Sequence, residues 1–394
     1  EWYKNNGNGT FTLQALVSNT LGRVNGLAIA DLDNDSNNDI IATSYPLGQV
    51  VWFKNNGNGT FGTAQVIASG LTSVNTVKTG DIDGNNTIDV AVSAYGTNVY
   101  WYSNNGSGTF GSAQTISGLP NSGPVDFDLA DYDQDNDLDV VVAYGLINAI
   151  VLFDNDLTQT GNSTFNTYAL VDSANYDLMD VRFGDMDNNG DLEIIKVDKN
   201  QNIAFYDKSG GGSFSKTVFS TSNTSPTAVI ISDIDDDNMN DVVVGYSSTS
   251  TNDKLTWFQD SSTSGEELID ATQNDIYGFT LNDFDNDGDL DMASVSYNEN
   301  HLNWFENTTY NSSLGVDDFN KNEFGIYPNP ATNTLNFKSN ISEDVNLSVY
   351  DLLGKEVLNT SLNLKNSLDV SRLKTGIYII AFKDYNTTLK FIKQ

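Results

Sequence analysis

The chain has 394 residues, of which 53 are acidic and 19 basic, so its formal net charge at neutral pH is −34. Such an acidic surface disfavours binding to nucleic acid and to anionic membranes. The chain has no cysteine and a single histidine, His301, which excludes disulfides and leaves few candidates for a catalytic triad. No stretch approaches the roughly eighteen apolar residues of a transmembrane helix.

The N-terminal residues repeat a later part of the chain. Residues 2–11 read WYKNNGNGTF, and residues 52–61 read WFKNNGNGTF. We therefore expect residues 1–17 to be the back half of a structural repeat whose loop and first two strands are missing from this sequence. No signal peptide is present, which we ascribe to processing, truncation or disorder of the N-terminus.

An acidic nine-residue loop follows six times, about fifty residues apart. Positions 1, 3, 5 and 9 of each loop carry an oxygen-bearing side chain, and position 7 varies. In the first three loops these five positions are Asp31, Asp33, Asp35, Asn37 and Asp39; Asp81, Asp83, Asn85, Thr87 and Asp89; and Asp131, Asp133, Asp135, Asp137 and Asp139. In the last three they are Asp185, Asp187, Asn189, Asp191 and Glu193; Asp233, Asp235, Asp237, Met239 and Asp241; and Asp283, Asp285, Asp287, Asp289 and Asp291.

This spacing predicts six calcium sites. Calcium takes six to eight oxygen ligands, which four side chains and the backbone carbonyl of position 7 nearly supply. We expect weaker binding in the loops where position 5 is a neutral amide, at Asn85 and Asn189. An EF-hand is excluded because position 12 carries no bidentate Glu. The remaining alternative is a set of solvated Asp/Asn turns, although a turn needs only one or two such residues.

The residues around each loop predict strands. The sequence before the first loop, residues 26–30, is apolar, and residues 39–43 after it alternate and include β-branched residues. An aromatic pair such as Trp52-Phe53 follows, then a turn rich in Asn and Gly and a fourth apolar stretch. Four strands in about fifty residues predict one blade of a β-propeller, with the aromatic pairs between blades.

These motifs resemble the FG-GAP and VCBS-type propeller repeats over residues 1–307. Those repeats place an Asp-rich loop between the first two strands of a blade and follow it with a Trp-Phe-x-Asn-Asn-Gly-x-Gly-Thr-Phe segment. Integrin head propellers use similar loops, and the resemblance implies structural calcium, although the fourth loop departs from the pattern at Glu193. We expect an all-β, seven-bladed propeller with an incomplete first blade; a six-bladed ring closed by the terminal strands is the alternative.

A polar, patternless linker is expected at residues 308–320, and a small immunoglobulin-like β-sandwich at residues 321–394. Residues 317–394 carry equal numbers of acidic and basic residues, unlike the repeats. The segments at 327–330 (YPNP), 349–357 (VYDLLGKEV), 368–371 (LDVS), 376–380 (GIYII) and 390–394 (KFIKQ) resemble the type A C-terminal sorting domain of the Bacteroidota type IX secretion system.

The resemblance of the tail implies export across the periplasm and outer membrane, by way of the type IX translocon and its outer-membrane shuttle. It also implies removal of the tail and attachment to surface lipopolysaccharide, as is common for such proteins. An ordinary adhesion module is the alternative reading of residues 321–394.

We expect a non-catalytic, calcium-binding module, secreted or attached to the outer-membrane surface, that binds an unidentified surface glycan or protein. Six carboxylates outside the loops keep open a propeller enzyme acting on polysaccharide: Asp126, Asp128, Asp177, Asp180, Glu266 and Glu267. A further alternative is a scaffold for a functional domain in the missing N-terminal region.

Overall fold

The computed structural model divides the chain into two compact units, Glu1–Asn307 and Thr308–Gln394. The residues that it describes are 2–6, 10–116, 119, 122–165, 167–173, 177–199, 203–209, 213–219, 225–247, 253–273, 276–285, 287–296, 301–307, 325–338, 344–351, 354–383 and 387–394. The expected linker at 308–320 lies outside these residues.

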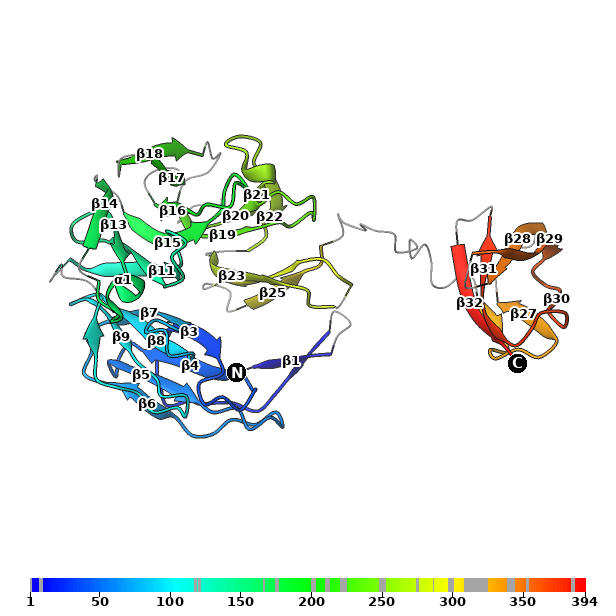
Figure 1. The fold of residues 1–394 in the computed structure, drawn as a ribbon, viewed down its shortest axis with the longest axis horizontal. Coiled ribbons are helices and arrows are strands. Elements are labelled where there is room, and N and C mark those ends of the chain that lie inside the picture. Colours follow the sequence, from blue (N-terminus) through cyan, green and yellow to red (C-terminus); the bar gives the residue numbers. More distant parts are fainter. Residues whose placement is uncertain are drawn as a thin grey trace. The chain divides into compact units, whose positions relative to one another are not determined.

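The first unit is a succession of antiparallel sheets arranged around a centre (Figure 1). The first three are β3 (Val24–Ala30), β4 (Asp39–Ser44), β5 (Gln49–Phe53) and β6 (Gln65–Ala68); β7 (Val74–Gly80), β8 (Asp89–Ala94), β9 (Val99–Tyr102) and β10 (Gln114–Thr115); and β11 (Pro124–Ala130), β12 (Asp139–Tyr144), β13 (Ala149–Asp154) and β14 (Thr167–Ser173).

Three further sheets continue the succession. They are β15 (Leu178–Gly184), β16 (Glu193–Asp198), β17 (Ala204–Ser209) and β18 (Ser213–Val218); β19 (Pro226–Ser232), β20 (Asp241–Tyr246), β21 (Leu255–Phe258) and β22 (Glu267–Asp270); and the three-stranded β23 (Ile276–Asn282), β24 (Asp291–Ser296) and β25 (His301–Phe305). A single helical turn, α1 (Leu157–Thr160), and a 3-10 turn, η1 (Gln259–Ser261), interrupt the connections. The β-propeller prediction is confirmed.

Each sheet is built in the same order, with its first strand at the centre. The first strand pairs with the second, which is the most buried: every residue of β8, β12, β16 and β20 is buried. This burial accounts for the runs of Val and Ile in these segments, since a strand covered on both faces needs no polar alternation. The outermost strands, such as β6 and β18, are mostly exposed.

The aromatic pairs lie between neighbouring sheets, as predicted. Trp52 of β5 packs in one cluster with Val77 and Val90 of the next sheet, and Trp101 of β9 packs with Phe127 of the sheet after it. Each aromatic ring removes a large apolar area from water, so these contacts supply much of the cohesion between sheets. The order of packing around the centre therefore follows the order of the repeats in the sequence.

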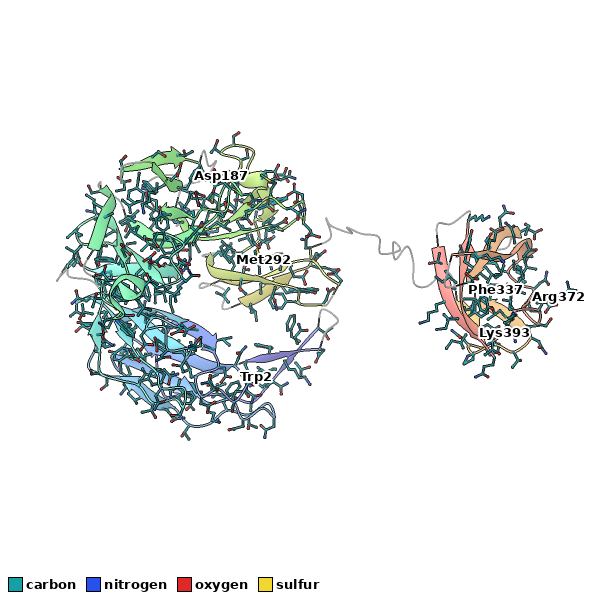
Figure 2. All side chains as sticks on the ribbon, viewed as in Figure 1. Trp2, Asp187, Met292, Phe337, Arg372 and Lys393 are labelled. Carbon is teal, nitrogen blue, oxygen red and sulfur yellow. The ribbon has the colours of Figure 1, made fainter. Side chains whose placement is uncertain are left out.

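The hairpin of β1 (Tyr3–Asn5) and β2 (Phe11–Leu13) lies beside the sixth sheet. An Asn side chain that follows the aromatic pair donates to the carbonyl of loop position 2 in the preceding sheet. The pairs are Asn104 and Leu32 (2.8 Å), Asn155 and Ile82 (3.1 Å), Asn307 and Ile234 (2.9 Å), and Asn5 and Phe284 (2.5 Å). The hairpin thus follows the sixth sheet as the second, third and sixth sheets follow their predecessors. Figure 2 labels Trp2 next to this hairpin and Met292 on β24.

Among the described residues, the β1–β2 hairpin has no inner strands beside it, and apolar side chains are exposed on the first and sixth sheets, on the two sides of the space that such strands would occupy. Leu27 on β3 is 67% exposed, whereas the equivalent Val77, Phe127, Val181 and Val229 are at most 3% exposed. Val295 and Leu302 of the sixth sheet are 46% and 56% exposed, whereas the equivalent Thr43 and Val50 of the first are fully buried. This arrangement supports a seventh blade over a six-bladed ring, and the blade number remains a prediction.

A seventh inner half-blade should therefore complete the ring. Joining a copy of residues 18–50 ahead of Glu1 reproduces the order of a complete blade, because Glu1 corresponds to Val51. Covering the exposed apolar side chains should raise the melting temperature, and the added loop should bind one more calcium ion in titration calorimetry. As a control, the same insert with its loop aspartates changed to alanine should add no calcium. A protease-sensitive insert that adds neither calcium nor stability would contradict the seven-bladed arrangement.

The second unit consists of two sheets around one core. The first sheet contains β26 (Gly325–Tyr327), β27 (Thr334–Lys338) and β30 (Leu368–Asp369). The second contains β29 (Glu356–Asn363), β28 (Asp344–Asp351), β31 (Gly376–Phe382) and β32 (Thr387–Lys393). Phe337, Phe382 and Phe391 are buried in the core between them. Two packed sheets agree with a β-sandwich, and the immunoglobulin-like topology remains a prediction.

Candidate metal centres

The six acidic loops connect the first strand of each sheet to the second, as expected. Positions 4 and 6 adopt left-handed backbone conformations in every loop where they are described. These residues are Asn34, Ser36, Gly84, Asn86, Gln134, Asn136, Asn188, Gly190, Asp236, Asn238 and Gly288, with φ between 55° and 103°. Glycine and residues with short polar side chains tolerate this conformation best. The alternation turns the side chains of positions 1, 3 and 5 toward a common centre.

The carboxylate at position 1 fixes the turn. One Asp31 oxygen accepts the backbone N–H of Asp35 at 3.1 Å, and the other accepts that of Ser36 at 2.7 Å. Position 1 of the other five loops makes the same two bonds, at 2.8–3.2 Å. The side chain at position 5 accepts the N–H of position 7, as Asp35 does from Asn37 at 2.9 Å. The loop is therefore shaped by its own candidate ligands.

The carboxylate at position 9 is the first residue of the second strand and is at most 2% exposed in all six loops. One oxygen accepts the N–H of position 2; in the first loop, Asp39 accepts that of Leu32 at 3.1 Å. The other oxygen accepts an N–H just after the third strand, which for Asp39 is that of Asn55 at 2.7 Å. Position 9 of the second, third, fifth and sixth loops makes the same pair of bonds.

Several carboxylate oxygens at the centre of the loops have no hydrogen-bond partner. In five loops three candidate ligand atoms lie within 4.8 Å of one another; in the first they belong to Asp31, Asp33 and Asp39. Buried oxygens without a donor are Oδ1 of Asp33, Asp235 and Asp285 at position 3, and Oδ1 of Asp137 and Asp289 at position 7. A buried carboxylate oxygen without a partner is costly, and a hard cation removes that cost. The donor set therefore fits calcium.

The unpartnered carboxylate oxygens of Asp137 and Asp289 add a candidate side-chain ligand at position 7 to the expected backbone carbonyl. Position 7 was expected to offer only its backbone carbonyl. In these two loops its carboxylate is also buried and available. A variable position thus adds ligand oxygens in the loops where it is aspartate.

Burial raises the pKa of the position 9 carboxyls in the first five loops. Because desolvation penalises the charged form, the pKa is raised to about 6 in Asp89 and Asp241 and to about 7 in Asp139 and Glu193. Burial, with the charge of Asp287 second, raises the pKa of Asp289 to about 7. These carboxyls are thus poised to take up protons near neutral pH when no cation is bound.

The side chain that follows each aromatic pair distinguishes the loops. In the first loop the Lys54 ammonium contacts Asp33 and lies 2.9 Å from Asp35. In the second, the Ser103 hydroxyl donates to Asp83 at 2.6 Å, and in the fifth the Gln259 amide donates to Asp235 at 2.7 Å. The position 3 carboxylate of these loops already has a donor within the protein.

In the third loop the equivalent residue is another carboxylate, Asp154. Its Oδ1 is buried without a partner, and its pKa is raised by burial and then by the charge of Asp133. In the fourth loop Asp207 holds this position and contributes to the raised pKa of Glu193. The sequence analysis missed both residues, although their position directly after the aromatic pair repeats in every blade. Two carboxylates facing one loop increase its need for a cation.

Chelation should destabilise the protein. A ligand that binds only the native state adds RT ln(1 + [Ca²⁺]/Kd), which is about 2.7 kcal/mol per site at a hundredfold excess over Kd. Calorimetric scans should show a markedly lower melting temperature in EDTA, restored by excess calcium. A melting temperature that is the same in EDTA and in calcium would exclude these loops as calcium sites.

Stability should depend on pH in opposite directions with and without calcium. In the metal-free protein the raised pKa of the position 9 carboxyls favours the folded state at low pH, and this contribution is lost as pH rises through about 6–7. Calcium requires the ionised carboxylates, so its affinity should rise over the same range. Melting temperatures from pH 5 to 8 should therefore fall in dialysed protein and rise in saturating calcium. Parallel slopes in the two conditions would contradict this assignment.

Single substitutions should rank the loops. Replacing Lys54 with methionine removes a competing cation, so calcium affinity at the first loop should increase. Replacing Asp154 with asparagine removes a charged candidate ligand, so affinity at the third loop should decrease. Calcium titration calorimetry of both variants and the parent provides the measurement. Unchanged affinities would show that the residue after the aromatic pair does not act on the loop.

Family models match both units of the chain. The FG-GAP-like repeat model matches residues 31–92 and 81–142, and that of the secretion system C-terminal sorting domain matches residues 325–394. None of the curated proteins matches the chain significantly. Among the described residues, no helix has the length and apolar character needed to span a bilayer.

Several solved structures resemble the chain. An Agrocybe aegerita lectin that recognises non-reducing terminal N-acetylglucosamine is 17% identical, with 73% of this chain and 81% of the lectin covered and a TM-score of 0.49. Virginiamycin B lyase from Staphylococcus aureus is 12% identical, with 74% and 87% covered and a TM-score of 0.46. A Lactobacillus plantarum protein is 14% identical, with 75% and 87% covered and a TM-score of 0.49. At these scores, none of the three likenesses decides a feature of this chain.

The two family matches agree with the motifs found in the sequence and with the two units of the fold. The chain carries FG-GAP-like repeats in a β-propeller and ends in a sorting domain of the type IX secretion system, which directs its export to the cell surface or the medium.

Proposed function

We propose that the protein is a calcium-stabilised propeller that acts as a non-catalytic binding module at or beyond the cell surface. The observation that carries the calcium assignment is the set of buried, unpartnered carboxylate oxygens in the acidic loops. About six calcium ions would occupy loops that connect the strands of every sheet, and the metal would serve structure rather than chemistry. A chain without disulfides gains from such a metal staple once it has been exported.

Two features support binding over catalysis. The carboxyls of Asp126 and Asp180 meet at the centre of the propeller, where Arg182 Nη2 lies 3.8 Å from the first and 3.0 Å from the second. Glycoside hydrolysis needs two carboxyls roughly 5–10 Å apart, with the sugar between them. The neighbouring cations Arg182 and Lys78 pair with these carboxylates and with Asp128, so none of the three is free to act as a base.

The rival function is a propeller enzyme acting on polysaccharide. Asp126, Asp128 and Asp180 come together at the centre, whereas Glu266 hydrogen-bonds Tyr246 and Thr256 at the edge of the fifth sheet. The central trio is therefore the specific candidate for catalysis. The scaffold hypothesis, in which another domain carries the activity, has no described residue in its favour.

A paired assay tests the proposal. The full chain in calcium should bind intact cells or immobilised surface polysaccharide, should lose that binding in EDTA, and should release no reducing ends from a polysaccharide panel. Calcium-independent binding would contradict the metal role. Release of sugar products that disappears in Asp180→Asn would replace the proposed function with the enzyme.

The sorting domain should act as an address that is separable from binding. Deleting residues 321–394 should leave a folded, calcium-binding propeller that accumulates in the periplasm, because the two units have separate cores. Fusing residues 308–394 to a periplasmic reporter should send the reporter out of the cell, as fractionation and immunoblotting would show. A protein without this tail that still reached the surface would show that residues 321–394 are an adhesion module.

A further inference from the structure

The innermost strands surround the centre of the propeller (Figure 1), and residues from two rows on these strands line a cavity there. Side chains alternate along a strand, so the residues four and two positions before the last residue of each of these strands lie on the same face. The first row contains Gly26, Thr76, Asp126, Asp180, Ala228 and Gly278. The second contains Ala28, Lys78, Asp128, Arg182, Ile230 and Thr280. Eleven of these twelve residues line a cavity of about 950 Å³.

The two rows do not repeat from blade to blade. The position between them is apolar in every blade, as Leu27, Val77, Phe127, Val181, Val229 and Phe279. The middle four of these side chains are buried between sheets, whereas Leu27 faces the place of the missing inner strands. The rows themselves are polar or charged on β7, β11 and β15, and small or apolar at most positions of β19, β23 and β3. Positions that serve the common fold repeat, whereas these do not. The contrast points to a role specific to this cavity.

The polar wall consists of six side chains, which are held by one another and by backbone N–H groups. The Thr76 hydroxyl donates to Asp126 at 2.5 Å, and the Lys78 ammonium lies 2.8 Å from Asp128. The Val229 N–H donates to Asp180 at 3.1 Å, and the Arg182 Nη2 lies 3.0 Å from the same carboxyl. Asp126 and Asp180 are 5% and 3% exposed. The group is therefore rigid before any ligand arrives.

Hydrogen-bonding capacity remains on this wall. Nη1 of Arg182 is buried without a hydrogen-bond partner among the described residues, and its nearest Asp128 oxygen lies 4.0 Å away. An unpaired buried donor is costly unless a ligand or water satisfies it. Two cations, Lys78 and Arg182, face the carboxyls of Asp126, Asp128 and Asp180, so the charges of the cluster nearly balance.

The wall of the cavity opposite the polar side chains carries small residues, which leave space for a ligand. A Cβ added at Gly278 would meet only Val295, at 3.8 Å, so packing does not require a glycine there. Ala28 and Ala228 are likewise small. Leu27, Val295 and Leu302 also line the cavity, so part of its volume is the space left for the inner strands of the incomplete blade. A mostly apolar lining with a few convergent polar groups is the usual composition of small-molecule sites.

We propose that this central cavity binds a neutral sugar residue of a surface glycan. This proposal rests on the proposed binding function and names its site. Sugar hydroxyls both donate and accept hydrogen bonds, so they can donate hydrogen bonds to the carboxyls of Asp126 and Asp180 and accept them from Arg182 and Lys78. The apolar face of the ring would lie against the small and apolar wall. A balanced cluster within a chain of net charge −34 offers no attraction for an acidic sugar.

The test is a titration of the full chain in calcium with neutral methyl glycosides and disaccharides, with amino acids and acidic sugars as comparison probes. At least one neutral sugar should bind with millimolar or better affinity. Gly278→Phe should weaken that binding about tenfold or more by filling the cavity, and Asp180→Asn should do so by replacing a carboxyl oxygen with an amide group that only donates. The matched surface change Asp344→Asn, in the second unit, should bind as the parent does. Calcium stoichiometry should be the same in all variants.

The outcomes separate the two proposals. A neutral sugar that binds Gly278→Phe as tightly as the parent would overturn the cavity as its site while leaving the binding function standing. Absence of binding by every neutral sugar, or binding of amino acids or acidic sugars alone, would overturn the ligand class. The binding function itself fails only if the full chain also fails to bind cells and immobilised polysaccharide.

Discussion

In five of the six loops, a buried carboxylate at the end of the acidic loop holds the first three strands of a sheet together. In the first sheet, Asp39 begins β4, accepts an N–H from the loop after β3, and accepts another from the residue after β5. Asparagine, the neutral side chain of the same size, has only one acceptor oxygen and could not accept an N–H at each end. The same burial that makes the bonds strong also disfavours the ionised form on which they depend. A cation beside this carboxylate resolves the conflict, so the geometry of the sheet and the calcium loop form a single structural unit.

Much of this unit could be predicted from the sequence because its parts are local. The Asp residues of a loop lie within nine positions, and alternation marks the strands on either side. The left-handed residues at positions 4 and 6, such as Asn34 and Gly84, belong to the types that such turns require. The burial of Trp52 and Trp101 between blades was likewise predictable, since a feature repeated in every blade must serve contacts that every blade makes.

The remaining features depend on contacts between distant residues or on positions that do not repeat. Lys54 and Asp154 lie more than twenty residues from the start of their loops, and only the pairing of β5 or β13 with the second strand brings them near it. The meeting of Asp126 and Asp180 requires two neighbouring blades to converge on the centre. Nothing in the spacing of these residues along the chain distinguishes them from the many other aspartates.

The bond from Asn104 to the Leu32 carbonyl makes neighbouring blades share their loops. The N–H of Leu32 also donates to Asp39, so this residue is held by its own blade through its N–H and by the next blade through its carbonyl. A loop that loosens on losing its ion releases a contact of the blade that follows. Because neighbouring blades share a loop in this way, the weakest loop limits the stability of the whole ring more than the average loop does.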